Sequence, residues 1–248
     1  MIRTLIDPQE YDGTSIRITN REKLHHLSTV RRAQVGAAIT CTDGQGTSYI
    51  GRIEAITRGE LCIRVERIDR AEATPGFRVT IAAALIKPAR FDWLVEKTAE
   101  LGAAKLVPLV TDRTTIQLDP LRREAKIARW QRIADEALQQ CGRTETMMVE
   151  PISTLKEFFA RTNKESRIFI PTLDGERHHL NPYAGFFAEG TRINVVALIG
   201  PEGDFTPGEL KLAVEHGAVP ITLGPLTLRS ETAAAALLAV LQYSSGQW

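Results

Sequence analysis

VTIAAALIKPARFDWLVEKTAELGAAKLVPLV, residues 79–110, is the stretch that decides the fold class. Its first part, residues 79–86, is a continuous apolar run, which is typical of a strand buried on both faces of a sheet. Residues 90–102 have the apolar spacing of an amphipathic helix and end at a glycine. A second apolar run follows at residues 105–110. A strand, a helix and a strand in this order predict a βαβ unit with parallel strands.

The same alternation continues toward the C-terminus. We expect a long helix at residues 123–141, a shorter one at 154–161 and an almost wholly apolar one at 232–241. Buried strands are expected at 167–171, 193–199 and 220–223. Together these segments predict an α/β domain whose parallel sheet is flanked by helices on both faces.

The N-terminal part has a different pattern of apolar and polar residues. The segments AITCT, TSYIGRIEAI and ELCIRVERI alternate apolar and polar residues and are separated by DGQG and TRGE. Period-two alternation between glycine turns predicts a small antiparallel sheet, either a β-barrel or a sandwich. We expect the polar residues 69–76, which include Pro75 and Gly76, to form a linker. We therefore expect two domains.

Composition excludes several classes of protein. Among 248 residues, 25% are charged and 43% hydrophobic, and the net charge is +1, which disfavours disorder and a uniformly basic nucleic-acid wrapper. We expect no signal peptide, no membrane segment and a cytoplasmic location. Cys41, Cys62 and Cys141 lie far apart without a C-x-x-C pair, so neither disulfides nor a zinc site is expected. His178 and His179 lack ligand partners at metal-binding spacing.

Two apolar strands near the C-terminus run directly into Gly-Pro loops: VVALIGPEGDF (195–205) and ITLGPLTLRSETA (221–233). Ligands of open parallel sheets bind at the carboxyl ends of strands, and glycine lets backbone groups approach a flat ligand. The alternative for each glycine alone is a tight strand-to-helix turn. Neither a P-loop nor a dinucleotide motif is present, so the two loops together favour a pocket for a nucleoside-like molecule. Thr206 and Glu209 form a capping box, and Ser230 is a suitable N-cap.

IGPEGDFTPGE (199–209) and LGPLTLRSETA (223–233) resemble the C-terminal signature of the RsmE family of SPOUT-class RNA methyltransferases. The resemblance continues through HHLSTVRR (25–32), DGQG (43–46), EKTAELG (96–102) and RWQRIADEALQQCGR (129–143). It implies a PUA-like β-barrel domain at 1–72, a SPOUT methyltransferase domain with a C-terminal trefoil knot at 73–248, and a homodimer. The implied reaction is methylation of N3 of a uridine in 16S ribosomal RNA of the small subunit with S-adenosylmethionine. The implied cofactor-binding residues are Thr172, Leu173, Leu198, Gly200, Pro201, Glu202, Gly203, Leu223, Gly224, Leu226 and Leu228.

The chain departs from the family pattern at three positions. Asp204 stands where a second glycine is usual, and we expect it to cap the helix that follows rather than hinder the backbone. Leu226 replaces the usual arginine, and Met147 stands where proline is common. Catalysis must therefore rest on residues other than the one at position 226.

Methylation of uridine N3 requires loss of the imide proton and stabilisation of the charge that develops on O2 and O4. Arg229, which matches the arginine of the family signature, is the expected cation. Glu231, Glu202 and water are all candidate proton acceptors. The alternative for Arg229 is a structural role in a tight loop, and for Glu202 a carboxylate that accepts loop N–H groups.

RNA binding is expected at a basic segment, residues 17–32, which holds five Lys or Arg against one Glu. The alternative is a solvated charged surface. The expected RNA-binding residues are Arg3, Arg17, Arg21, Lys23, Arg31, Arg32 and Arg143. The apolar helix at 232–241 needs burial on more than one side, which favours a homodimer over a central helix of a monomer.

Two other functions are alternatives to methyl transfer. A non-catalytic RNA-binding or ribosome-assembly protein with a decayed methyltransferase domain would explain Asp204 and Leu226, but Gly200, Gly224 and Arg229 are intact. An α/β hydrolase is disfavoured because no G-x-S-x-G elbow is present.

Overall fold

A computed structural model describes residues 2–70, 77–116, 119–163, 165–173, 175–180 and 193–246. The chain divides into two compact units. The first holds the described residues up to 70 together with Leu138–Thr146, and the second holds the other described residues from 77 onward.

The first unit is a curled five-stranded sheet with the strand order β1-β3-β4-β5-β2. Its strands are β1 (Ile2–Leu5), β2 (Ser15–Ile18), β3 (Ala38–Thr42), β4 (Thr47–Ile56) and β5 (Leu61–Arg70). The predicted segments form β3, β4 and β5, which pair antiparallel as expected. Sequence patterning did not predict β2, which pairs antiparallel with β5, or β1, which pairs parallel with β3.

Alternating side chains of these strands form the core of the first unit. Ile16, Ile39 and Ile63, on three different strands, are fully buried in it. The residues directly before and after each of them in sequence are more exposed. Burial of one such side chain contributes roughly 1.5–3 kcal/mol. Gly51 has no room for a side chain, because a Cβ would lie 2.0 Å from the carbonyl oxygen of Arg64.

Leu138–Thr146 is joined to the first unit by backbone hydrogen bonds around the turn between β3 and β4. The Gly46 amide donates to the Thr144 carbonyl at 3.0 Å, and the Thr146 amide donates to the Gly44 carbonyl at 2.9 Å. The Thr42 hydroxyl donates to the same Thr144 carbonyl at 3.1 Å. This small unit is therefore completed by residues that come from far along the chain.

The second unit is built on a seven-stranded sheet with the order β12-β10-β11-β6-β7-β8, in which β9 also pairs with β7. Its strands are β6 (Phe77–Ala84), β7 (Lys105–Val110), β8 (Met148–Val149), β9 (Ser153–Thr154), β10 (Arg167–Pro171), β11 (Ile193–Ile199) and β12 (Ala218–Ile221). Every pairing between these strands is parallel, as the βαβ pattern predicts. The observed β12 lies two residues earlier than the predicted strand at 220–223.

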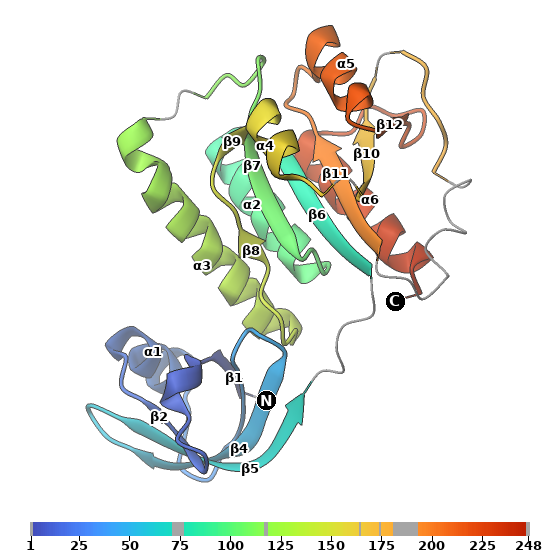
Figure 1. The fold of residues 1–248 in the computed structure, drawn as a ribbon. Helices are drawn as coiled ribbons and strands as arrows, with labels where there is room; N and C mark the ends of the chain where they lie inside the picture. The colour runs from blue at the N-terminus through green and yellow to red at the C-terminus, as the bar shows by residue number, and fades with distance from the viewer. Residues whose placement is uncertain are drawn as a thin grey trace. The chain divides into compact units, whose positions relative to one another are not determined.

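Helices cover both faces of this sheet, as predicted (Figure 1). They are α2 (Pro88–Glu100), α3 (Arg123–Cys141), α4 (Leu155–Arg161), α5 (Pro207–Glu215) and α6 (Ser230–Ser244). Ile81 and Ala83 of β6 pack on the face covered by α2, α3 and α6. Ala82 between them packs on the face covered by α4 and α5. Successive residues alternate between the two cores, which explains why residues 81–84 of the strand are all apolar.

The N-cap of α5 is the predicted one, whereas the N-cap of α6 is not. Thr206 is the N-cap of α5 and forms the predicted capping box with Glu209, with Pro207 at the first helical position. The expected N-cap role of Ser230 is wrong. Arg229 is the N-cap of α6, with an extended backbone and no side-chain capping bond, and Ser230 is already helical and buried.

Candidate active site

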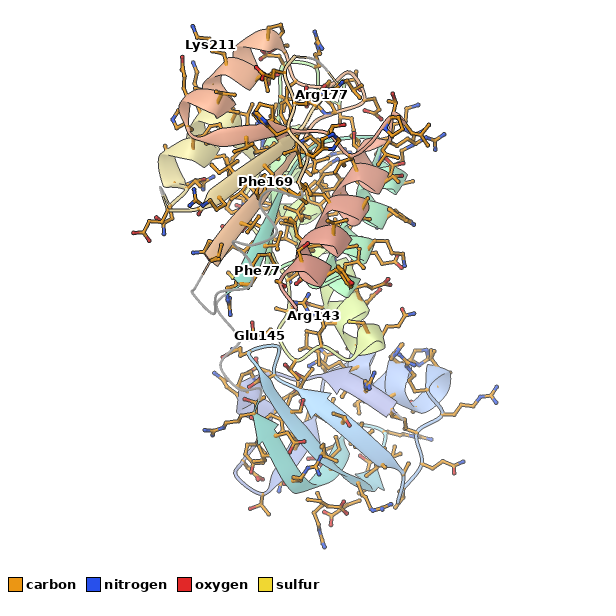
Figure 2. All side chains as sticks on the ribbon, turned by 90° about the vertical axis from the view of Figure 1, so that its right-hand side faces the viewer. Phe77, Arg143, Glu145, Phe169, Arg177 and Lys211 are labelled. Atoms are coloured by element: carbon orange, nitrogen blue, oxygen red, sulfur yellow. The ribbon has the colours of Figure 1, made fainter. Side chains whose placement is uncertain are left out.

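The carboxyl ends of β10, β11 and β12 meet around a cavity of about 210 Å³. Figure 2 shows Phe77 near one end of the sheet, Arg177 near the opposite end and Phe169 between them. The cavity lies at the end marked by Arg177, where ligands of parallel sheets bind. Its described lining is Pro171, Thr172, Leu173, Arg177, Ile199, Gly200, Pro201, Glu202, Asp204, Thr222, Leu223, Gly224, Leu226, Thr227, Leu228, Arg229, Ser230 and Ala233.

Two glycines of this lining have little tolerance for a side chain. Gly224 has a φ of +111°, a conformation that residues with a Cβ rarely adopt. Gly200 is closely packed, because a Cβ there would lie 3.2 Å from both Asp204 Oδ1 and the Phe205 ring. The two Gly-Pro loops therefore do more than turn the chain: both contribute their backbone to one cavity wall.

Asp204 does not cap α5, so that expectation is wrong; Thr206 holds the N-cap position instead. The Asp204 carboxylate joins two loops of the cavity. Its Oδ2 accepts a hydrogen bond from the Thr172 hydroxyl at 3.0 Å and from the Leu173 amide at 2.9 Å. Its Oδ1 accepts from the Phe205 amide at 2.7 Å.

Arg113, which follows β7, anchors the loop after β11. Its Nη1 donates to the Gly203 carbonyl at 2.6 Å, and a Cβ on Gly203 would contact the Arg113 side chain. Next to it, the Asp112 amide donates to Glu209 Oε1 at 2.8 Å. Gly203 thus serves the anchoring of the loop, and it is not part of the described cavity lining.

The structure brings together most of the cofactor-binding residues predicted from the sequence. Those that line the cavity are Thr172, Leu173, Gly200, Pro201, Glu202, Leu223, Gly224, Leu226 and Leu228. Leu198 does not line it, because its side chain is fully buried in the core under α4 and α5. Period two explains the difference, since Ile199, the next residue, points the other way and reaches the cavity. Arg177 lines the cavity without any sequence motif that could have indicated it.

Arg229 and Glu231 lie at the start of α6 beside the cavity. Arg229 is exposed and contributes to the lining. Glu231 is buried, and its Oε1 lies 3.7 Å from Nε of Arg90, a residue of α2. Nη1 of Arg90 lies 3.5 Å from Glu202 Oε1, so this guanidinium bridges a carboxylate of the loop after β11 and one in the first turn of α6. Glu231 Oε2 is buried without a hydrogen-bond partner among the described residues.

The chemistry of the cavity fits S-adenosylmethionine. Leucine side chains at 223, 226 and 228 offer apolar surface for a purine ring, and the loop backbones offer N–H and C=O groups to its polar edge. The carboxylate of Glu202 suits a cationic ligand group, and the guanidinium of Arg177 suits a carboxylate.

The predicted RNA-binding residues of the basic segment lie in the first unit, on β2, on α1 (Arg21–His25) and after the following π-helix (His26–Val30). Arg17 lies 3.8 Å from Asp12 and 4.0 Å from Glu60, and Lys23 lies 3.1 Å from Glu10. Arg21, Arg31 and Arg32 are exposed. Arg32 has a φ of +50°, which is uncommon for a residue with a side chain. Cations thus remain available on this surface after its ion pairs are formed.

Arg3 and Arg143 belong to the same unit as the basic segment. The Arg3 guanidinium lies against Gly142, where a Cβ would come within 2.5 Å of Arg3 Nη1. Figure 2 shows Arg143 directly after α3. The structure therefore places both near the end of α3, apart from the basic segment in sequence.

The described part of the chain holds neither a metal cluster nor a membrane-spanning helix. Within it, no three His, Cys, Asp or Glu side chains are grouped as a metal site would require. None of its helices combines the length and the apolar character needed to cross a membrane. His178 takes part in backbone pairing, since its amide donates to the Pro220 carbonyl at 2.9 Å.

Comparison with known proteins gives two family matches and close structural relatives. Residues 73–242 match the RNA methyltransferase domain and residues 18–66 the RNA methyltransferase PUA domain. The chain is 27% identical over 229 residues to ribosomal RNA small subunit methyltransferase E of Bacillus subtilis, covering 90% of this chain and 88% of the relative.

Two solved structures resemble the protein over nearly their full lengths. One is a methyltransferase of Legionella pneumophila in complex with the bound cofactor SAM, with a TM-score of 0.86, 26% identity and coverage of 98% of this chain and 97% of that one. The other is ribosomal RNA small subunit methyltransferase E of Neisseria gonorrhoeae bound to S-adenosyl methionine, with a TM-score of 0.86, 25% identity and the same coverages. The family match extends over more than half of the sequence, and the chain belongs to the RNA methyltransferase domain family.

Proposed function

We propose that this protein transfers the methyl group of S-adenosylmethionine to N3 of a specific uridine in 16S ribosomal RNA of the small ribosomal subunit. The observation that carries the proposal is the cavity formed by two Gly-Pro loops and the loop after β10. Relatives of the chain are named small subunit ribosomal RNA methyltransferases, and similar structures hold S-adenosylmethionine. When bound, S-adenosylmethionine supplies a methyl group on a positively charged sulfur, which an anionic nitrogen can accept.

In this proposal Arg229 is the catalytic cation. When the uridine imide loses its N3 proton, negative charge spreads over O2 and O4. This charge is consumed as the carbon–nitrogen bond forms and the carbon–sulfur bond breaks. The exposed guanidinium of Arg229, which contributes to the cavity lining, suits those oxygens because its donors are fixed in a plane. The target base must leave its stack to present N3.

Glu231 is the proposed proton acceptor. Its unpaired buried Oε2 and its position two residues after Arg229 support this role. Oε2 is buried and Glu231 is outside the described lining of the cavity, so this role requires the carboxylate to move toward the uridine when the RNA binds. Arg90 holds the other oxygen and so orients the carboxylate. The proton leaves N3 for Oε2, and the electron pair of the N–H bond forms the new bond to carbon.

The RNA is proposed to contact Arg3, Arg17, Arg21, Lys23, Arg31, Arg32 and Arg143, with residues 1–72 as the RNA-binding domain and residues 73–248 as the methyltransferase domain. The PUA and methyltransferase matches support this division. Exposed arginines suit phosphate groups, whose binding is dominated by charge. The site of action is proposed to be the cytoplasm, where ribosomal subunits reside.

A homodimer and a C-terminal trefoil knot are also proposed. Val240 and Tyr243 of α6 are 46% and 74% exposed, while the opposite side of the helix is buried, so a second copy could cover the apolar face. For the knot, β12 lies at the edge of the sheet, yet α6, which follows it, packs under β6 and β11. Val240→Glu should shift the molar mass measured by light scattering from dimer to monomer.

The test of the reaction is to incubate the purified protein and S-adenosylmethionine with small ribosomal subunits that lack the modification. The RNA is then digested and analysed by mass spectrometry for N3-methyluridine. Its appearance, and its absence when S-adenosylmethionine is omitted, is the expected result. Bound cofactor without any methylated uridine would refute the assignment of the acceptor. A protein that binds RNA but no cofactor would favour the non-catalytic alternative, which the intact cavity disfavours.

A further inference from the structure

Asp204 has a left-handed backbone conformation, which is unusual for a residue with a side chain. Its φ is +60°, in the left-handed region where glycine is favoured and residues with a Cβ are disfavoured. Among the described residues, Arg32 is the only other non-glycine residue with a positive φ. An interaction of the side chain must offset the unfavourable conformation, because glycine at this position would avoid it.

The side chain of Asp204 provides that interaction. Its two carboxylate oxygens accept three hydrogen bonds, and two of these come from Thr172 and Leu173 in the loop after β10. These partners lie 32 and 31 residues earlier in the chain. Thr172, Leu173 and Asp204 all line the cavity, so the contact joins two of its walls. Hydrogen bonds to a charged acceptor are the stronger kind.

The Asp204 carboxylate is itself held in place. The Asp204 amide donates to the Pro201 carbonyl at 2.9 Å, which closes the loop after β11 into a turn. Gly200, in the same loop, leaves just enough room for Oδ1, since a Cβ there would lie 3.2 Å from it. The carboxylate therefore has a fixed orientation toward the loop after β10.

We propose that Asp204 is a positioning residue of the cofactor cavity, whose carboxylate fastens the loop after β10 to the loop after β11 before the cofactor binds. This inference rests on the function proposed above. We call the hydrogen bonds from Thr172 and Leu173 to the Asp204 carboxylate the clip. Preorganisation of two loops reduces the entropy cost of binding, so the clip raises affinity for S-adenosylmethionine without touching the reacting atoms.

The experiment compares Asp204→Gly with Asp204→Ala. Both remove the clip, but glycine adopts the positive φ freely and alanine does not. If the clip matters, both variants bind S-adenosylmethionine about tenfold or more weakly in calorimetry, as loss of hydrogen bonds to a charged group predicts. Asp204→Gly should nonetheless melt at a higher temperature than Asp204→Ala. Asp119→Gly, at an exposed position outside the cavity lining, is the matched control and should bind like the wild type.

Hydrogen exchange gives a readout that does not depend on the cofactor. The Leu173 amide donates to Asp204, so it should exchange faster in Asp204→Gly than in the wild-type protein. Thr172→Val removes one donor without backbone strain and should weaken binding less. Combined with Asp204→Gly, it should add little, because both changes act on one contact.

Three results would overturn the inference. Wild-type affinity in Asp204→Gly would mean that only the backbone conformation matters. Unchanged exchange at Leu173 would mean that the loops are held without the carboxylate. Failure of the wild-type protein to bind S-adenosylmethionine would overturn this inference and the proposed function together, whereas the first two results leave the proposed function standing.

Discussion

Gly200→Ala tests how tightly the cavity wall is packed. The new Cβ would lie 3.2 Å from Asp204 Oδ1 and 3.2 and 3.3 Å from two carbons of the Phe205 ring. These distances are a few tenths of an ångström shorter than ordinary contacts, so one neighbour must move. Phe205 is buried against the core under α4 and α5, and the Asp204 carboxylate is held by three hydrogen bonds. Neither can move freely.

Overpacking of this kind costs about 1–3 kcal/mol. In a chain of this size each kcal/mol lowers the melting temperature by roughly 2–4 °C. We therefore expect Gly200→Ala to melt several degrees below the wild type in a calorimetric scan. Binding of S-adenosylmethionine should weaken as well, because relief of the clash displaces the Asp204 carboxylate from Thr172 and Leu173.

Gly208→Ala is the matched control. Gly208 is a helical residue of α5, and a Cβ there would meet nothing within 4 Å. Replacing glycine by alanine at a compatible position stabilises the folded protein by about 0.4–1 kcal/mol, because it reduces the conformational entropy of the unfolded chain. The two substitutions should therefore change the melting temperature in opposite directions. Equal melting temperatures for Gly200→Ala and the wild type would refute the packing argument.

Three further predictions concern the reaction, the RNA and the thiols. Arg229→Ala should retain S-adenosylmethionine binding while N3-methyluridine formation falls by about 100-fold or more, as loss of one charge-stabilising group predicts; unchanged turnover would exclude Arg229 as the cation. Arg31→Ala combined with Arg32→Ala should weaken RNA binding and lower the slope of log affinity against log salt by about 0.7 for each phosphate group that is no longer neutralised; an unchanged slope would place the RNA elsewhere. Burial raises the pKa of the Cys41 thiol to about 12, so it stays protonated and unreactive at neutral pH and would ionise only as the pH approaches that value. Exposed Cys141 should take up iodoacetamide at about pH 8 and buried Cys41 should not, as peptide mass spectrometry would reveal.

Much of the fold could be predicted because many of its strands and helices have recognisable patterns within their own sequence. The run at 79–110 predicts β6, α2 and β7 through apolar continuity, helical spacing and a closing glycine. β1 and β2 escaped prediction because each has four residues, too few for an alternation to stand out. Their pairing with β3 and β5 depends on contacts from distant segments, which a pattern within one segment does not reveal.

In the candidate site, too, features set by neighbouring residues could be predicted and those set by distant residues could not. The Gly-Pro loops were predictable because glycine, proline and the preceding apolar strand are neighbours in sequence. The role of Asp204 was not, since helix capping is a local interaction and its actual partners are Thr172 and Leu173. Arg90 was missed for the same reason, because it lies far in sequence from Glu202 and Glu231, which it joins.

The contribution of Leu138–Thr146 to the first unit bears on how such a chain can evolve. Recombination that moved only the segment up to residue 70 into another gene would leave the carbonyl of Gly44 and the amide of Gly46 without Thr146 and Thr144. A gene segment that ends at residue 70 would therefore encode the smaller unit without part of its hydrogen bonding. We expect the segment up to residue 70 and residues 138–146 to be inherited together.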